Sequence, residues 1–246
     1  MTSLPSGRLV LDTYARRARL QPALLVALPL GIAVLAWFPK GLTEWGVFAG
    51  LLTSAGGTAL LARLARIRGK RLESELFELW GGKPTTVALR HRDSQNPVLL
   101  ERRHAQLSRI ARGISIPRAP EERVDPHAAD AAYDACVTVL IERTRDRKRF
   151  PLLFEESCNY GFWRNLWGLR PIGIAASLLG TAAMVLLAYR HGFALDFKTA
   201  IGGGIDLFFL LGWLFLVRKD VVRMAASSYS DRLLGTCEDL AAQESH

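Results

Sequence analysis

One ionisable residue stands inside an otherwise apolar run. Asp206 directly follows Gly202, Gly203 and Gly204 in "TAIGGGIDLFFLLGW". A carboxylate at membrane depth is costly, and it normally faces the interior of a helix bundle, a partner or water. It lies seven residues from Thr199, roughly 10 Å in from that end of a helix, which we expect to be the outer end. Two interpretations stay open: a pore-lining acidic ring that favours cations, with the glycines as gating elements, or a structural carboxylate that caps a glycine-broken helix.

A second set of groups could hold phosphate. The segment "GGKPTTVALRHR" supplies a lysine, two hydroxyls and an Arg-His-Arg triplet within a dozen residues: Lys83, Thr85, Thr86, Arg90, His91 and Arg92. Backbone N–H groups, hydroxyls and guanidinium groups are what bind phosphate oxygens, although the spacing is not that of a P-loop. A nearby basic group comprises Arg102, Arg103 and Arg109. We predict that both groups bind a ligand, and attraction to anionic lipid headgroups is the simpler alternative.

The chain carries no residue pattern of a known catalytic site. It lacks His-Glu-x-x-His and Gly-x-Ser-x-Gly, its five histidines are scattered, and its three cysteines have no metal-like spacing. The adjacent Glu155 and Glu156 would not face each other on a helix. We therefore expect neither an enzyme nor a metal or cofactor site.

Four apolar blocks are the first of the elements that must position these groups. Each is long enough to cross a hydrocarbon core of ~30 Å; they are residues 20–38, 45–62, 171–189 and 199–217. A soluble bundle is the alternative, but blocks apolar all round would need a very large surrounding core in water. A cleaved signal peptide is the alternative for the first block, yet a second span follows closely and no convincing cleavage site ends the first.

Lys and Arg near the ends of these blocks set the expected orientation. They are abundant before the first and third blocks and after the second and fourth, and sparse in the two short connections. By the positive-inside rule, both termini and the long middle stretch are cytoplasmic. We therefore expect a multi-pass protein of a cell membrane, with residues 1–19 as a cytoplasmic N-terminus and 218–246 as a cytoplasmic C-terminal helix or tail.

The stretch 63–170 is long enough for a small domain and is rich in Lys and Arg. Helices are expected over 63–80, ended by Gly81-Gly82, over 96–112 from Pro97, and over 125–144 with Asp125 as N-cap. Residues 83–92 could form a lone strand, which would make the domain α+β, and 113–126 read as a loop. The aromatic-rich segment near 150–168 predicts an interfacial helix at the headgroups or, alternatively, an element that couples domain and membrane. The fold class is thus mainly α: four transmembrane helices with a small cytoplasmic domain inserted between spans two and three.

Small residues recur at helical spacing in two spans. Gly46 and Gly50 form a Gly-x-x-x-Gly pair in the second span, and Ala176 and Gly180 a similar pair in the third. Such stripes let transmembrane helices approach closely. Packing within one chain could use both, but the number of small faces favours a homo-oligomer.

Three stretches carry a family resemblance: "GGKPTT..LRHR", "DP.AADAAY" and "CNYGFWRNLWGLRPIG". Together with the span arrangement they resemble small bacterial membrane proteins that serve as effectors of anti-phage defence, of the kind found in the Hailong system. The resemblance implies an oligomeric ion channel whose cytoplasmic part is controlled by a nucleotide or oligonucleotide made by a partner nucleotidyltransferase. The alternative is a non-conducting scaffold or anchor whose basic domain binds anionic lipid or a partner protein.

Overall fold

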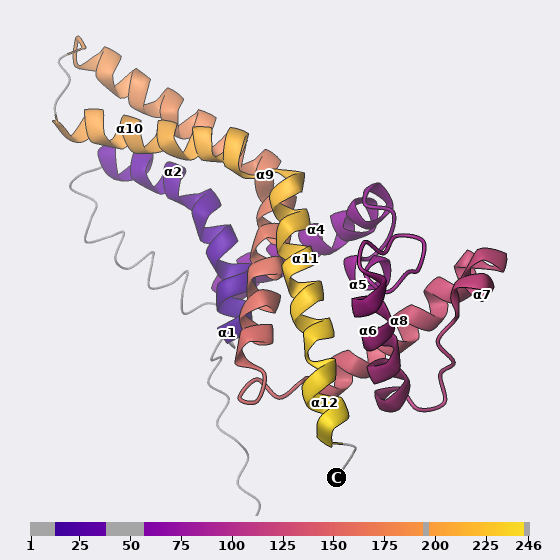
Figure 1. Ribbon diagram of the computed structural model, residues 1–246. Helices are drawn as coiled ribbons and strands as arrows, with labels where there is room; N and C mark the ends of the chain where they lie inside the picture. The colour runs from indigo at the N-terminus through magenta and orange to yellow at the C-terminus, as the bar shows by residue number, and fades with distance from the viewer. Residues whose placement is uncertain (1–12, 38–56, 194–196, 244–246) are drawn as a thin grey trace, which may run out of the picture. The chain divides into compact units, whose positions relative to one another are not determined.

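The computed structural model describes residues 13–37, 57–193 and 197–243, and this part of the chain is mostly helical and contains no strand (Figure 1). The elements of the first half are α1 (Thr13–Ala15), the π-helical turn η1 (Arg16–Leu20), α2 (Gln21–Trp37), α4 (Gly57–Leu79), α5 (Pro84–Val87), α6 (Pro97–Ile110) and α7 (Ala119–Val124). Those of the second half are α8 (Pro126–Arg143), α9 (Pro151–Arg190), α10 (Phe197–Leu211), the π-helical turn η3 (Gly212–Leu216), α11 (Lys219–Gly235) and α12 (Cys237–Gln243).

The chain divides into two compact units, each built from separate stretches of sequence. Unit 1 comprises Met1–Leu72 and Gly161–Arg218, and unit 2 comprises Glu73–Tyr160 and Lys219–His246. Helices α4 and α9 supply residues to both units. The C-terminal helices α11 and α12 belong to unit 2, although the sequence pattern presents residues 218–246 as a separate segment.

Unit 1 holds three helical segments that are long and apolar enough to cross a membrane: Thr13–Trp37, the apolar part of Pro151–Arg190, and Thr199–Leu216. They correspond to the first, third and fourth predicted spans. Most of the predicted second span, 45–62, lies outside the described residues, which resume with α4 at Gly57.

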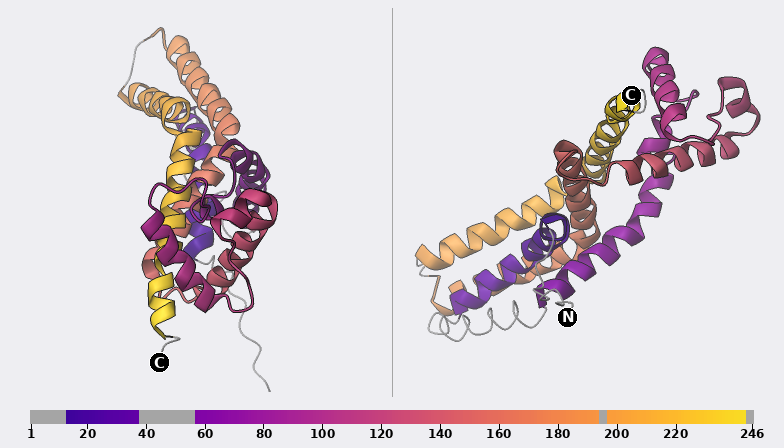
Figure 2. Two further views of the ribbon diagram at one scale, coloured as in Figure 1. Left: turned by 45° about the vertical axis from the view of Figure 1, so that its right-hand side comes forward. Right: turned by 90° about the horizontal axis from the view of Figure 1, so that it is seen from below.

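The helices of unit 1 meet at glycines. A methyl carbon at Gly168 of α9 would lie 2.8 Å from the backbone nitrogen of Gly69 in α4, so the two backbones touch there. At Gly173 a methyl carbon would meet the indole of Trp213 at 2.2 Å. Helix α2 runs beside α10 (Figure 2), and the Trp37 indole N–H donates to the Ala183 carbonyl of α9 over 3.0 Å.

Unit 2 has its own apolar core between α6, α8, α11, α12 and the first turn of α9. Its buried members include Leu107, Ile110, Tyr133, Cys136, Leu140, Phe150, Leu153, Leu233, Leu234 and Cys237. Phe150 and Leu153 lie in the segment that the sequence assigns to a headgroup-level helix. Their side chains are buried in protein here, and the helix continues without interruption to Arg190.

Local sequence signals correctly predict where several helices begin and end. Gly81 and Gly82, both at positive φ, follow the end of α4. Asn96 caps α6 by accepting from the Leu99 amide, and Asp125 caps α8 by accepting from two amides of its first turn. Each cap satisfies donors that an isolated helix end leaves free.

Two local predictions are wrong. Residues 84–87 form the single helical turn α5 rather than a strand: Pro84 fixes a helix-compatible φ at the first position, where its missing N–H is not needed. The predicted loop over 113–126 contains the short helix α7, which begins where Glu121 accepts from the Arg118 backbone amide over 2.8 Å.

Candidate functional site

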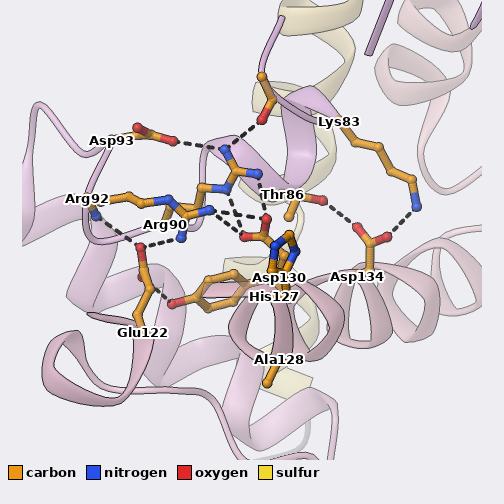
Figure 3. Close-up of polar contacts among 12 residues, drawn as sticks. Lys83, Thr86, Arg90, Arg92, Asp93, Glu122, His127, Ala128, Asp130 and Asp134 are labelled. Atoms are coloured by element: carbon orange, nitrogen blue, oxygen red, sulfur yellow. Dashed lines mark hydrogen bonds and ion pairs between the residues drawn. The ribbon is translucent and has the colours of Figure 1, made fainter. Parts of the chain in front are cut away.

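The predicted phosphate-binding segment, 83–92, faces helix α8 across a cluster of ion pairs in unit 2 (Figure 3). We name it the ion-pair cluster. It contains three cationic side chains and four carboxylates: Lys83, Arg90, Arg92, Asp93, Glu122, Asp130 and Asp134. The structure therefore brings the predicted residues together, but in contact with acidic partners.

Arg90 is the centre of the cluster. Its guanidinium group donates to both carboxylate oxygens of Asp130, over 2.8 and 2.6 Å, in a bidentate pair. The Nη1 amino group of Arg90 donates to the Gly81 carbonyl oxygen over 2.9 Å and to the Asp93 carboxylate over 3.0 Å. A methyl carbon at Gly82 would come within 2.7 Å of the same guanidinium group. The glycine turn thus makes room for Arg90, which is 7 % exposed.

Glu122 is the most deeply buried carboxylate of the cluster, at 1 % exposure. It accepts from the backbone amides of His91 over 2.7 Å and Arg92 over 3.2 Å, from the Arg92 guanidinium over 2.8 Å, and from the Tyr133 hydroxyl over 2.8 Å. Burial by itself raises the pKa of this carboxyl, but these hydrogen bonds outweigh it and leave the pKa below its usual value. Glu122 is therefore a charged, fully bonded core residue.

The remaining predicted side chains complete the same network. Lys83 and the Thr86 hydroxyl both contact the carboxylate of Asp134, and Thr85 is buried. Asp130 and Asp134 are one turn apart on α8, so they lie on the same face of that helix. Arg92 also pairs with Asp130, at 3.0 Å.

His91 and His104 close the cluster on the side of α6. Their rings lie 4.9 Å apart edge to face, and His104 stacks on the Tyr133 ring at 5.6 Å. Each imidazole has one ring nitrogen against a backbone carbonyl oxygen, at Pro117 for His91 and Leu89 for His104. Burial lowers the pKa of His104, so the folded unit holds this ring neutral.

The charges within the cluster bear directly on anion binding. Every cation of the predicted segment already contacts a carboxylate, and the carboxylates outnumber the cations. A phosphate group would have to displace Asp130 from Arg90, which would leave a buried ion pair broken. The acidic residues were not predicted from the sequence, although the spacing of Asp130 and Asp134 beside the core residue Tyr133 is a signal that could have found them.

The second predicted basic group lies on α6 and is more open. Arg102 pairs with Glu238 of α12 at 3.1 Å, with both side chains more than half exposed, and Arg103 pairs with Asp231 of α11 at 3.3 Å. Arg109 is exposed in the last turn of α6. An exposed ion pair such as Arg102–Glu238 contributes between about 0 and 1 kcal/mol to stability, so a competing anion could displace Glu238.

Asp206 occupies a separate site in unit 1. It lies near the middle of the candidate span Thr199–Leu216, rather than near one end, and its side chain is 0 % exposed. Neither of its carboxylate oxygens has a hydrogen-bond partner among the described residues. A methyl carbon at Gly180 of α9 would lie 2.8 Å from Asp206 Oδ2 and 3.1 Å from the Pro29 carbonyl oxygen of α2. Three helices therefore meet at this carboxylate.

The three glycines before Asp206 do not break the helix. Helix α10 begins at Phe197 and continues through Asp206, so the carboxylate is not an N-cap. Gly202 lies on the buried face, where a methyl carbon would meet Met184 at 2.4 Å; Gly203 has only a distant neighbour, and Gly204 has open space.

Ala176 and Gly180, the small-residue pair of the third predicted span, are also buried inside unit 1. This pair therefore serves packing within the chain.

Among the described residues, no three His, Cys, Asp or Glu side chains come together as metal ligands. Compared with known proteins, the chain matches no protein-family model, no curated protein and no solved structure.

Proposed function

We propose that this protein is the ion-conducting subunit of a channel in a bacterial inner membrane, acting as an effector of anti-phage defence and controlled by a ligand on unit 2. The observation that carries the proposal is Asp206: a carboxylate without a partner among the described residues, enclosed among three helices that are apolar enough to span a membrane. Ionisable residues in such positions mark ion pathways.

The enclosure of Asp206 bears on the path of the ion. A ring of carboxylates around an oligomeric pore requires each side chain to reach the subunit surface, and Asp206 does not. A path inside the helix bundle of each subunit agrees better with its burial. Assembly into a homo-oligomer then rests on the pair Gly46 and Gly50, which lies outside the described residues.

For the controlling ligand, the α6 cations are better candidates than the ion-pair cluster. Arg102 and Arg109 are exposed, and the Arg102 ion pair is weak enough for an anion to replace Glu238. A nucleotide or oligonucleotide supplies such anions. To open the channel it must bind the open state more tightly than the closed state, and the continuous helices α4 and α9 link unit 2 to the spans covalently.

Planar-bilayer recording of the purified protein tests the proposal. We expect a cation-selective conductance that changes when a short oligonucleotide is added to the side bearing unit 2. Asp206→Asn should alter its selectivity. Arg102→Glu with Arg109→Glu should remove the oligonucleotide response and leave the selectivity unchanged. Absence of conductance with every ligand tried would contradict the channel.

The defence role has its own test. Phage should form plaques less efficiently on cells that carry the protein with its neighbouring genes than on cells without it. Asp206→Asn should abolish this difference at equal expression. Equal plating of phage with and without the protein would contradict a defence role while leaving the channel untouched.

A non-conducting scaffold is the second candidate, and the ion-pair cluster favours it. A basic segment whose cations are bound internally to Asp93, Glu122, Asp130 and Asp134 acts as a folded structural module. Such a module suits protein recognition better than phosphate binding. Binding of a partner protein by a preparation that does not conduct would support this candidate.

A further inference from the structure

We infer that Asp206, together with oxygen atoms of α2 and α9, binds a monovalent alkali cation at the centre of unit 1. The inference deepens the proposed function, on which its physiological meaning rests, by naming the ion class and the groups that hold it. Binding itself does not require conduction, so the two can be tested separately.

The groups that converge on this point are acceptors of hydrogen bonds. Asp206 contributes two carboxylate oxygens with no donor among the described residues. The Pro29 carbonyl oxygen approaches the same point beside Gly180, since both it and Asp206 Oδ2 lie within 3.1 Å of the position that a methyl carbon at Gly180 would take. The glycine thus leaves open the space in which these oxygens meet.

Two neighbouring oxygens lie one turn away. Ser177 precedes Gly180 by three residues on α9 and therefore shares its face; it is 0 % exposed, and its hydroxyl has no partner among the described residues. Pro29 has no amide hydrogen, so it cannot donate to the carbonyl oxygen of Leu25 in the preceding turn of α2. Helix carbonyls point toward the C-terminus, which directs that of Leu25 toward the level of Pro29.

A cation satisfies such a set better than a proton does. A proton on Asp206 makes one hydrogen bond from one carboxylate oxygen and leaves the other carboxylate oxygen without a donor among the described residues. A cation coordinates several oxygens at once, and backbone carbonyls near a proline- or glycine-interrupted helix are known ligands of Na⁺ and K⁺ in membranes. Carboxylate, hydroxyl and carbonyl oxygens are hard ligands suited to hard cations.

The charge of the site selects a monovalent ion. Only one carboxylate contributes, since Asp206 is the one acidic residue among the described residues of unit 1. One positive charge makes the site neutral, whereas a divalent cation would leave an unfavourable net charge at membrane depth.

The test uses the full-length protein in detergent, with its thermal unfolding midpoint followed by tryptophan fluorescence. Chloride salts of Na⁺, K⁺ and choline are compared at one ionic strength and one pH. We expect the alkali cations, and not choline, to raise the midpoint, and the rise to saturate as a single binding site requires. Equal midpoints in these three salts would overturn the inference. Calcium chloride at the same ionic strength is the fourth condition, and a larger rise with Ca²⁺ than with Na⁺ or K⁺ would overturn it too.

Substitutions locate the effect. Asp206→Asn should abolish the cation-dependent rise, and Gly180→Ala should weaken it because the methyl group takes the space between the two oxygens. Gly204→Ala is the matched control: it adds the same methyl group to α10 where nothing lies within 4 Å, so its cation response should equal that of the unchanged protein. Should Asp206→Asn fail to fold, Ser177→Ala replaces it, with a weaker cation response expected.

The outcomes separate the inference from the proposed function. A cation response in a preparation that never conducts refutes the channel and supports the binding site. Conductance that depends on Asp206, with no cation effect on unfolding, refutes the binding site alone. A midpoint that changes with pH but not with the cation assigns a proton to Asp206 and overturns the inference.

Discussion

Replacing Glu122 by glutamine tests whether the ion-pair cluster holds unit 2 together. Glutamine keeps the shape of the side chain but turns one accepting oxygen into a donating amide. The Glu122 carboxylate accepts four hydrogen bonds, two of them from the backbone amides of His91 and Arg92. After the change at least one buried donor loses its acceptor, because an amide nitrogen cannot accept.

The expected cost follows from burial. A buried donor left without a partner costs about 1–3 kcal/mol. The lost attraction to Arg92 adds less than about 1 kcal/mol, since that side chain is partly exposed and screened by solvent. We take about 2 kcal/mol as the loss in the free energy of opening, which corresponds to a roughly 30-fold larger open population.

Cysteine labelling measures this opening in the intact protein. All three cysteines, Cys136, Cys158 and Cys237, are buried thiols outside any disulfide, and they are located in unit 2. Burial raises the pKa of the Cys237 thiol to about 12, so the folded protein suppresses its reactive thiolate. The rate of labelling by a maleimide under native conditions should rise about 30-fold in Glu122→Gln.

Glu121→Gln is the matched control. Glu121 is the neighbouring residue of α7 and is exposed, and its side chain accepts only the Arg118 backbone amide among the described residues. Its replacement should change labelling by no more than about twofold, as for most surface substitutions. If Glu122→Gln labels within threefold of Glu121→Gln, the cluster does not stabilise unit 2 as argued.

Three further changes probe the same unit. Burial lowers the pKa of His104, so the unfolded chain takes up a proton near pH 6.5 that the folded chain does not. The urea midpoint of unfolding should therefore decrease as the pH is lowered from about 7.5 to 5.5, and this decrease should be smaller in His104→Gln. Gly82→Ala should lower the urea midpoint more than Gly81→Ala: both have positive φ, but only a methyl group at Gly82 meets Arg90, at 2.7 Å. Asp125→Ala removes the cap of α8, so it should cost about 1 kcal/mol and speed cysteine labelling about fivefold.

The sequence predicts helix ends well because the signals are local. Asn96 with Pro97, and Asp125 with Pro126, place a side-chain acceptor and a proline at the two positions where a helix start needs them. The same local rules fail for residues 84–87, where Thr and Val suggest a strand. There the choice is made by tertiary contacts, since the hydroxyl of Thr86 bonds to Asp134, which is 48 residues away.

The character of the basic segment could not be predicted, for a related reason. Lys83, Arg90 and Arg92 are close together in sequence and look like an anion site. Apart from Asp93, which is near Arg90 in sequence, their partners lie 30 to 51 residues further along the chain. The charged residues within 83–92 are all basic, and only the fold shows that acidic side chains neutralise them. The stripe of Ala176 and Gly180 is similar, because sequence spacing identifies a close helix contact but not whether the other helix belongs to the same chain.

The two units treat buried charge in opposite ways, and this contrast is the strongest reason to treat Asp206 as functional. In unit 2 the buried Glu122 is surrounded by donors, and four hydrogen bonds offset the free-energy cost of removing its carboxylate from water. In unit 1 the equally buried Asp206 has no donor among the described residues, and Gly180 preserves space beside it. A carboxylate with a structural role needs such donors as much in a membrane as in a soluble core. We therefore expect the free energy of unit 1 to depend on what binds at Asp206, whereas that of unit 2 is set by contacts already made within the chain.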